Sequence, residues 1–246
     1  MQDSDRRSRD PQPALPHWGL WRTFLWTLGT LAALELTGGI AILIWQAAGH
    51  PATDADQDGA FFAFVGLIST PFALSVVVLA AYQKAGRSAP RYLGLALPTF
   101  RQTVIGAGWL LLTLVASDLI ALVSDQPLVT GFQIDTWRSA RDAGCLPALV
   151  LLILLASPVF EEILFRGFLL EELAASAMGP LAAIVVTAIL WTLLHVQYDW
   201  HVLVQIFVSG LLLGSVRLWS GSTLLAILLH VLMNIYATVE TIAYAS

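Results

Sequence analysis

The sequence is poor in charge and in cysteine, and both shortages exclude whole classes of protein. Only 12% of the 246 residues are charged, whereas a water-soluble globular domain typically carries about a quarter. The single cysteine, Cys145, excludes a disulfide framework and a cysteine-rich zinc module. With twelve Lys and Arg residues and a net charge of −5, the chain is also not expected to bind nucleic acid.

The chain is rich instead in long hydrophobic runs. Hydrophobic residues make up 57% of the sequence, and the mean hydropathy is +0.76. Since a helix needs roughly 20 apolar residues to cross a bilayer, this length allows six to eight spans in one domain and excludes two large domains. Seven runs stand between Gly, Pro, Asp or basic clusters, at 20–47, 61–82, 102–123, 146–168, 180–199, 201–219 and 222–240.

We therefore predict an all-α fold, a polytopic integral membrane bundle of about seven transmembrane helices. The count ranges from six to eight because the first run is long and is interrupted by Thr37-Gly38-Gly39. Residues 1–17 are charged and contain prolines, which predicts a disordered tail, followed by an uncleaved span. Residues 18–145 would form the N-terminal transmembrane helices, and 146–246 the functional core.

The positions of the cations predict the orientation. Positive residues gather in the tail, at the first boundary and in the 83–101 loop, at Arg6, Arg7, Arg9, Arg22, Lys84, Arg87, Arg91 and Arg101. The 48–60 loop has three aspartates and no cation, and the 124–145 loop has two arginines against three aspartates. Because cytoplasmic loops carry the excess of Lys and Arg, the N-terminus and the 83–101 loop should be cytoplasmic and the other two loops outside.

Ionisable residues within the spans are concentrated in the last 90 residues. Inserting a charged residue at the centre of a membrane helix costs about 2.5–3.5 kcal/mol on insertion scales. Each such residue is therefore expected to have a polar partner or a functional role. The fourth span ends in Glu161-Glu162, followed by Arg166. Glu162 and Arg166 are four residues apart in the favourable order, which predicts an ion pair. Glu161 points about 100° away from Glu162 on the helix and is free to meet other helices.

Two further spans carry polar residues that complete a catalytic constellation. His195 ends the fifth hydrophobic run, and His230 and Asn234 are four residues apart on one face of the last. A carboxylate and a histidine can hold a water molecule and remove its proton, while a second histidine and an amide can donate hydrogen bonds to an oxyanion. This set indicates water attack on a peptide carbonyl.

Other polar or small residues have simpler structural explanations. We expect His17, His50 and His201 to be packed or snorkelling side chains, and Glu171-Glu172 to be a solvated face because Ser176 replaces the matching arginine. Glu35 and Asp118 suit hydrogen bonds between helices or the lining of a water cavity. Gly210 and Gly214 form a GxxxG step typical of close helix packing.

In this order, Glu161-Glu162-xxx-Arg166, Trp191-xxx-His195 and His230-xxx-Asn234 closely resemble the motifs of the CPBP family, also called the Abi family. This family contains CAAX-processing and bacteriocin-processing intramembrane proteases. The resemblance covers residues 155–240, including the glycine-rich sixth span, whereas residues 1–145 resemble nothing specific. Trp191 stands where the family usually has Phe.

The resemblance implies a role for each motif residue. Glu161 would be the general base that activates water together with His195, His230 and Asn234 would stabilise the oxyanion, and Glu162 and Arg166 would orient the site. It implies an integral protein, most simply of a bacterial cytoplasmic (inner) membrane, that cleaves a membrane-associated peptide or protein, prenylated or not.

The sequence leaves the metal question open. Glu161, His195 and His230 could bind zinc with water in the fourth position. The His-Glu-x-x-His arrangement is absent, however, because Val196 follows His195. We favour a metal-free glutamic mechanism without a cofactor.

The heights of the motif residues in the membrane agree only in part. Glu161 and His195 are 14 and 15 residues from the 176–180 turn, about 21–22 Å at 1.5 Å per residue. His230 is only eight residues, about 12 Å, from the turn at Ser222. The site can close only if that turn lies about 10 Å higher, or if one helix starts later than the hydrophobic runs suggest.

Two other classes of function compete with the protease. A non-catalytic scaffold or bacteriocin-immunity factor could keep the fold, although it would be free to lose these costly charges. A proton-coupled transporter would explain Glu35 and Asp118, but the sequence shows no inverted repeats.

Overall fold

The computed structural model describes residues 18–50 and 58–245, and every regular element in this part is a helix. The predicted tail at 1–17, with His17, lies outside the described residues. The elements are α1 (Leu20–Ala47), α2 (Gly59–Ala85), η1 (Gly86–Ser88), α3 (Ala89–Tyr92), α4 (Phe100–Val123), α5 (Gly131–Asp142), α6 (Leu146–Leu151), η2 (Leu152–Ala156), α7 (Ser157–Glu162), η3 (Ile163–Leu169), α8 (Leu170–Ala175), α9 (Gly179–Leu193), α10 (Trp200–Ser220) and α11 (Thr223–Ala245).

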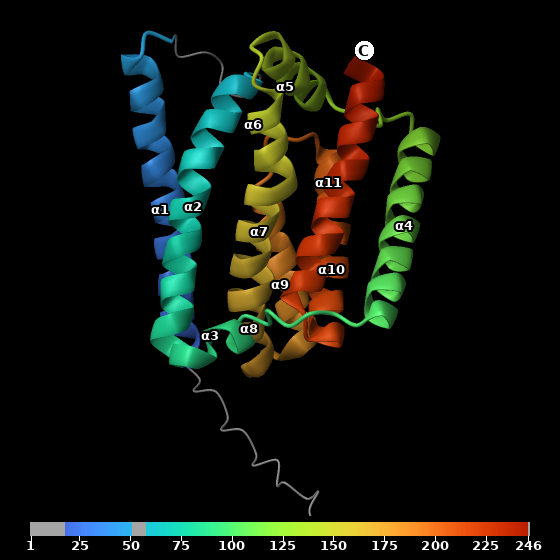
Figure 1. The fold of residues 1–246 in the computed structure, drawn as a ribbon. Coiled ribbons are helices and arrows are strands. Elements are labelled where there is room, and N and C mark those ends of the chain that lie inside the picture. Colours follow the sequence, from blue (N-terminus) through green and yellow to red (C-terminus); the bar gives the residue numbers. More distant parts are fainter. Residues whose placement is uncertain (1–17, 51–57, 246) are drawn as a thin grey trace, which may run out of the picture.

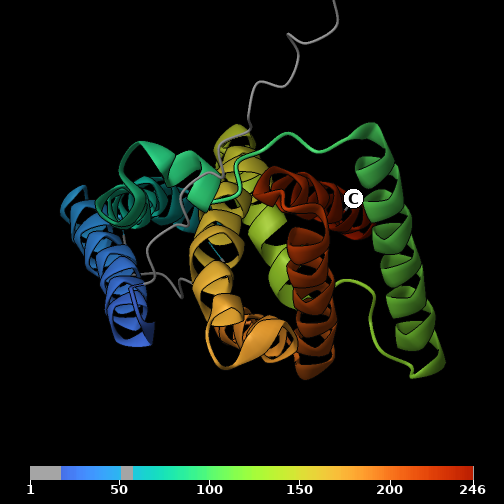
Figure 2. The ribbon, with the colours of Figure 1, turned by 90° about the horizontal axis from the view of Figure 1, so that it is seen from below.

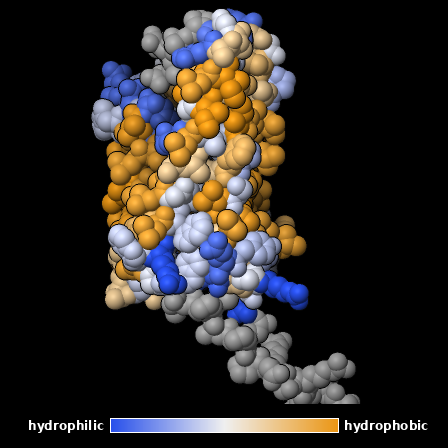
Figure 3. All heavy atoms as spheres, turned by 90° about the vertical axis from the view of Figure 1, so that its left-hand side faces the viewer, coloured by the Kyte–Doolittle hydropathy of each residue, from blue (hydrophilic) through white to orange (hydrophobic). Residues whose placement is uncertain are grey.

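Seven apolar segments run up and down between the two ends of the bundle (Figure 1). Six are long and apolar enough to cross a membrane, and the seventh is the 15-residue α9. On the face shown in Figure 3, hydrophobic residues fill the middle of the molecule and hydrophilic residues gather at both ends. The all-α membrane bundle predicted from the sequence is therefore confirmed, and each predicted run corresponds to one of the seven segments.

Local sequence sets where these segments begin and end. The Asp58 carboxylate accepts hydrogen bonds from the first backbone N–H groups of α2, and Thr99 and Gln102 form a reciprocal capping box at α4. Gly221 follows α10 with φ of 72°, a left-handed conformation that glycine adopts without strain. The sharp turn that follows allows α11 to return beside α10.

The segment between α4 and α6 contains a helix that the hydrophobic pattern did not indicate. The 12 residues of α5 are amphipathic and too few to span the membrane. Thr130 and Gln133 cap its start. In Figure 1, α5 lies across the end of the bundle opposite α3.

The segment 146–175 forms the centre of the bundle. Seen from the α3 end, α1 and α4 lie on opposite flanks, with the other long helices between them (Figure 2). The GxxxG expectation is correct, because a Cβ on Gly210 would lie 3.0 Å from Ala188 Cβ, and one on Gly214 would lie 3.3 Å from Ile184 Cγ2. This contact brings α10 onto α9, behind the functional residues.

The expectation that Glu171-Glu172 forms a solvated face is wrong for Glu172, whereas Glu171 remains partly exposed. Glu172 is buried and ion-paired with Lys84 of α2, and Glu171 Oε2 lies 2.9 Å from an Arg217 Nη2 of α10. The i,i+4 rule missed these pairs because both cations come from other helices. The two ion pairs tie α2, α8 and α10 together at the α3 end.

Candidate active site

The helix that carries the two glutamates widens on either side of them. Residues 152–156 and 163–169 are π-helical turns, closed by i→i+5 hydrogen bonds, and such turns are frequent at functional sites. Ser157-Pro158 gives a local cause for the first. Proline lacks an N–H group and its ring clashes with the carbonyl four residues earlier, so a wider turn relieves the clash.

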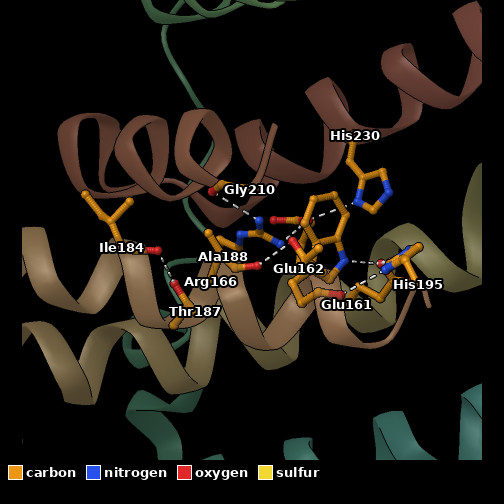
Figure 4. Close-up of polar contacts among 11 residues, drawn as sticks. Glu161, Glu162, Arg166, Ile184, Thr187, Ala188, His195, Gly210 and His230 are labelled. Atoms are coloured by element: carbon orange, nitrogen blue, oxygen red, sulfur yellow. Dashed lines mark hydrogen bonds and ion pairs between the residues drawn. The ribbon is translucent and has the colours of Figure 1, made fainter. Parts of the chain in front are cut away.

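Glu161 and His195 face each other across a gap (Figure 4). His195 Nε2 lies 4.0 Å from Glu161 Oε2, too far for a direct hydrogen bond but suited to a bridging water. His195 Nδ1 lies 2.9 Å from the Trp191 carbonyl oxygen. Because a carbonyl only accepts, Nδ1 carries the proton in the neutral ring, which leaves Nε2 with a free lone pair. The indole N–H of Trp191 donates to Glu161 Oε2 at 2.5 Å.

Glu162 lies behind this pair and is wholly buried. Its Oε1 accepts a hydrogen bond from Arg166 at 2.9 Å, as the i,i+4 spacing predicts, and lies 2.9 Å from His230 Nδ1. Glu162 and Arg166 have no exposed surface. Arg166 also donates to the Gly210 carbonyl oxygen and lies over the Trp191 ring, 4.5 Å from its centroid. This layer therefore fixes the orientation of His230 and of the Trp191 ring.

Asn234 takes its position from the first π turn. The Ser157 N–H donates to the Leu152 carbonyl, so the i→i+5 partner of the Ile153 carbonyl would be Pro158, which has no N–H. Asn234 Nδ2 instead donates to Ile153 oxygen at 2.7 Å. One N–H of the Asn234 amide is used in this hydrogen bond, and its second N–H can donate to another acceptor.

Glu161, His195, His230 and Asn234 line one cavity of about 420 Å³, whereas Glu162 and Arg166 do not reach its wall. The structure thus brings together the four residues that the sequence proposed for catalysis, from α7, α11 and the turn after α9. Tyr198, beside them in the same wall, stacks on His195. Burial, together with the negative charge of Glu161, raises the pKa of Tyr198 to about 12, so the phenol stays neutral.

The difference in height expected between His230 and the glutamates does not prevent the site from closing. Glu162 Oε1 lies 2.9 Å from His230 Nδ1. The Trp191 ring also packs edge-on against both histidines, with its centroid 5.2 Å from that of His195 and 5.3 Å from that of His230.

The other polar residues of the spans fall into two groups. Glu35 and Asp118 both line the cavity, which is one of the two roles expected for them. Asp118 also accepts a hydrogen bond from Tyr236 of α11, which is the other. His50 stacks on Trp45, and His201 is buried, as expected for packed side chains.

Sequence reasoning missed two parts of the site. It treated Trp191 as a replacement for Phe and did not assign a role to its indole N–H, a donor that Phe lacks. It also missed the Ile153 carbonyl, although the nearby Pro158 signals a disturbed helix.

The residues proposed as zinc ligands do not form a metal site in this arrangement. Within 18–50 and 58–245, no three His, Cys, Asp or Glu side chains gather closely enough to hold a metal ion.

Comparisons with known proteins identify the part of the chain that carries this site. Residues 144–236 match the family described as type II CAAX prenyl endopeptidase Rce1-like. No curated protein and no solved structure matches the chain. The matched segment includes both glutamates, Arg166, both histidines and Asn234. Residues 144–236 are therefore similar to the CAAX-protease family that the three motifs resemble.

Proposed function

We propose that this protein is an intramembrane endopeptidase of the metal-free, glutamic type, which hydrolyses a peptide bond of a membrane-associated protein or peptide. The observation that carries the proposal is the 4.0 Å gap between Glu161 Oε2 and His195 Nε2 in the cavity wall. Both groups are proton acceptors, so a water in this gap can donate one hydrogen to each. As that water attacks the carbonyl carbon, Glu161 takes its proton.

The oxyanion formed by this attack needs donors on the other side of the cavity. The second N–H of Asn234 is one, because the first is used on Ile153. His230 is the other. Its Nδ1–H donates a hydrogen bond to the Glu162 carboxylate, so Nε2 can also donate only when the ring is an imidazolium with a proton on each nitrogen. Glu162, which faces Nδ1 at 2.9 Å, stabilises that imidazolium. As the C–N bond breaks, Glu161 returns its proton to the leaving amine, so the amine and carboxylic acid products leave and Glu161 is again a carboxylate.

Trp191 is a positioning residue in this scheme. Its N–H holds one oxygen of Glu161, and its carbonyl fixes the tautomer of His195. One side chain and its backbone thus orient both groups that bind the water.

The test is to replace Glu161 with Gln, which keeps the shape and removes the base. Loss of a general base typically lowers the rate by about 10²–10⁴-fold. Cleavage of a membrane-anchored reporter is measured with purified variants whose folded amounts are matched by size-exclusion profile. Glu171→Gln is the matched control, since Glu171 is another membrane-helix glutamate but lies outside the cavity wall.

The outcomes separate the enzyme from its competitors. Parent and Glu171→Gln should cleave at similar rates while Glu161→Gln is nearly inactive. If Glu161→Gln cleaves as fast as the parent, Glu161 is not the base. If the parent cleaves no member of a broad peptide library, a scaffold or immunity role is favoured, and pH-driven uptake by proteoliposomes would identify a transporter.

A further inference from the structure

The two ends of the bundle differ in charge. Six cations lie at or near the α3 end, at Arg22, Lys84, Arg87, Arg91, Arg101 and Arg217, together with the two acids Glu171 and Glu172. The α5 end has Arg138 and Arg141, together with Asp58, Asp125, Asp135, Asp142 and Asp199. Because Lys and Arg are enriched on the cytoplasmic side, the α3 end faces the cytoplasm and the α5 end faces outside. Figure 1 shows α3 and α5 at opposite ends.

The cavity is sealed from the cytoplasmic end. Glu162 and Arg166, which have no exposed surface, lie immediately behind its wall. Beyond them Phe168, Leu169 and Leu173 are also fully buried, and the Lys84–Glu172 ion pair follows. Within the described chain, no residue of α3, η3, α8 or the 93–99 connection lines the cavity. A peptide at the cytoplasmic surface therefore meets several layers of packed side chains before the catalytic groups.

The cavity reaches the surface at the opposite end, and we call this opening its mouth. Gln133, Thr136 and Trp137 of α5 line the cavity, as do Gln197 and Tyr198 from the turn between α9 and α10. Gln197 is exposed to solvent, so the cavity wall continues to the outer surface at this point. Phe132 of α5 packs edge-on against Tyr198, with ring centroids 5.1 Å apart, and joins the two parts of the rim.

We propose that the site takes its substrate from the non-cytoplasmic side. The substrate class is a membrane-anchored peptide segment that lies in the outer half of the bilayer or emerges outside the cell. The cytoplasmic C-terminus of a lipid-anchored protein, the position of a CAAX sequence, does not reach Glu161 by this path. The cleavage step rests on the proposed function, whereas the sidedness of the mouth does not.

The sidedness is tested first without any substrate. Gln197→Cys and Leu97→Cys are each made in a Cys145→Ser background; Gln197 is at the mouth, and Leu97 is an exposed residue at the α3 end. Intact cells are treated with a membrane-impermeant maleimide. We expect Gln197→Cys to be labelled in intact cells and Leu97→Cys only after permeabilisation. The opposite pattern, or labelling of Gln197→Cys only after permeabilisation, would overturn the proposal.

The second measurement uses two single-span reporters that carry the same cleavable segment on opposite sides of the membrane. The parent should cleave the reporter whose segment emerges outside and leave its mirror image intact, and maleimide treatment of Gln197→Cys cells should block cleavage. Preferred cleavage of the cytoplasmic segment would contradict outside access. Absence of cleavage of both reporters, with the expected labelling pattern, would contradict the proteolytic function and leave the sidedness supported.

Discussion

Neighbouring residues of the same type have different environments here, and their environments decide their chemistry. Glu161 lines the cavity and faces His195, while Glu162 is enclosed and shared between Arg166 and His230. The helix rotation of about 100° per residue makes this difference predictable from sequence. The pairing of His230 with Glu162 was not predictable, because it joins residues 68 positions apart on different helices.

The contacts of these residues lead to a prediction about metal dependence. Within the described residues, Glu161, His195 and His230 do not gather closely enough to hold a metal ion. We expect the reporter-cleaving activity to survive extended dialysis against a chelator. Activity assayed before dialysis, after dialysis and after addition of zinc provides the check. Activity that disappears on dialysis and returns with zinc would make Glu161, His195 and His230 ligands instead.

At the level of helices, continuous apolar runs were sufficient to predict the seven segments, because lipid requires an unbroken apolar stretch in each. Contacts between helices were harder to predict. Glu171 forms an ion pair with Arg217 of α10, and Glu172 forms one with Lys84 of α2. The amphipathic α5 has too few apolar residues to stand out, although it forms part of the cavity rim.

The Lys84–Glu172 pair tests how these helices are held together. Both side chains are almost fully enclosed, and breaking a buried pair from one side typically costs about 3–5 kcal/mol, while replacing both members with apolar residues is often neutral. Lys84→Met alone should therefore lower the thermal unfolding temperature in detergent. The double variant Lys84→Met/Glu172→Leu should recover most of the loss. A double variant no more stable than Lys84→Met would show that the pair does not act as a unit.

On the scale of the whole molecule, an odd number of crossings would place the start of α1 and the end of α11 on opposite sides of the membrane. The seventh segment, α9, has only 15 residues, about 22 Å of helix at 1.5 Å per residue, which is shorter than the roughly 30 Å hydrocarbon core. It is nevertheless apolar and packs along α10, whose glycines allow close approach. Figure 1 places the start of α1 and the end of α11 at opposite ends of the bundle.

The final prediction concerns this parity and the orientation together. If all seven segments cross the membrane and the α3 end is cytoplasmic, as we propose, the C-terminal end of α11 should lie outside. Alkaline phosphatase is active only when it is exported, so it should be active when fused after α11. Green fluorescent protein exported unfolded to the same side does not become fluorescent, so the same fusion with this protein should not fluoresce. A fluorescent protein fused before α1 should fluoresce, which serves as the control for expression and insertion. Fluorescence from both fusions would mean an even number of crossings, and α9 would then be a re-entrant helix that enters and leaves on one side. Fluorescence from the C-terminal fusion alone would reverse the orientation and place the mouth of the cavity in the cytoplasm.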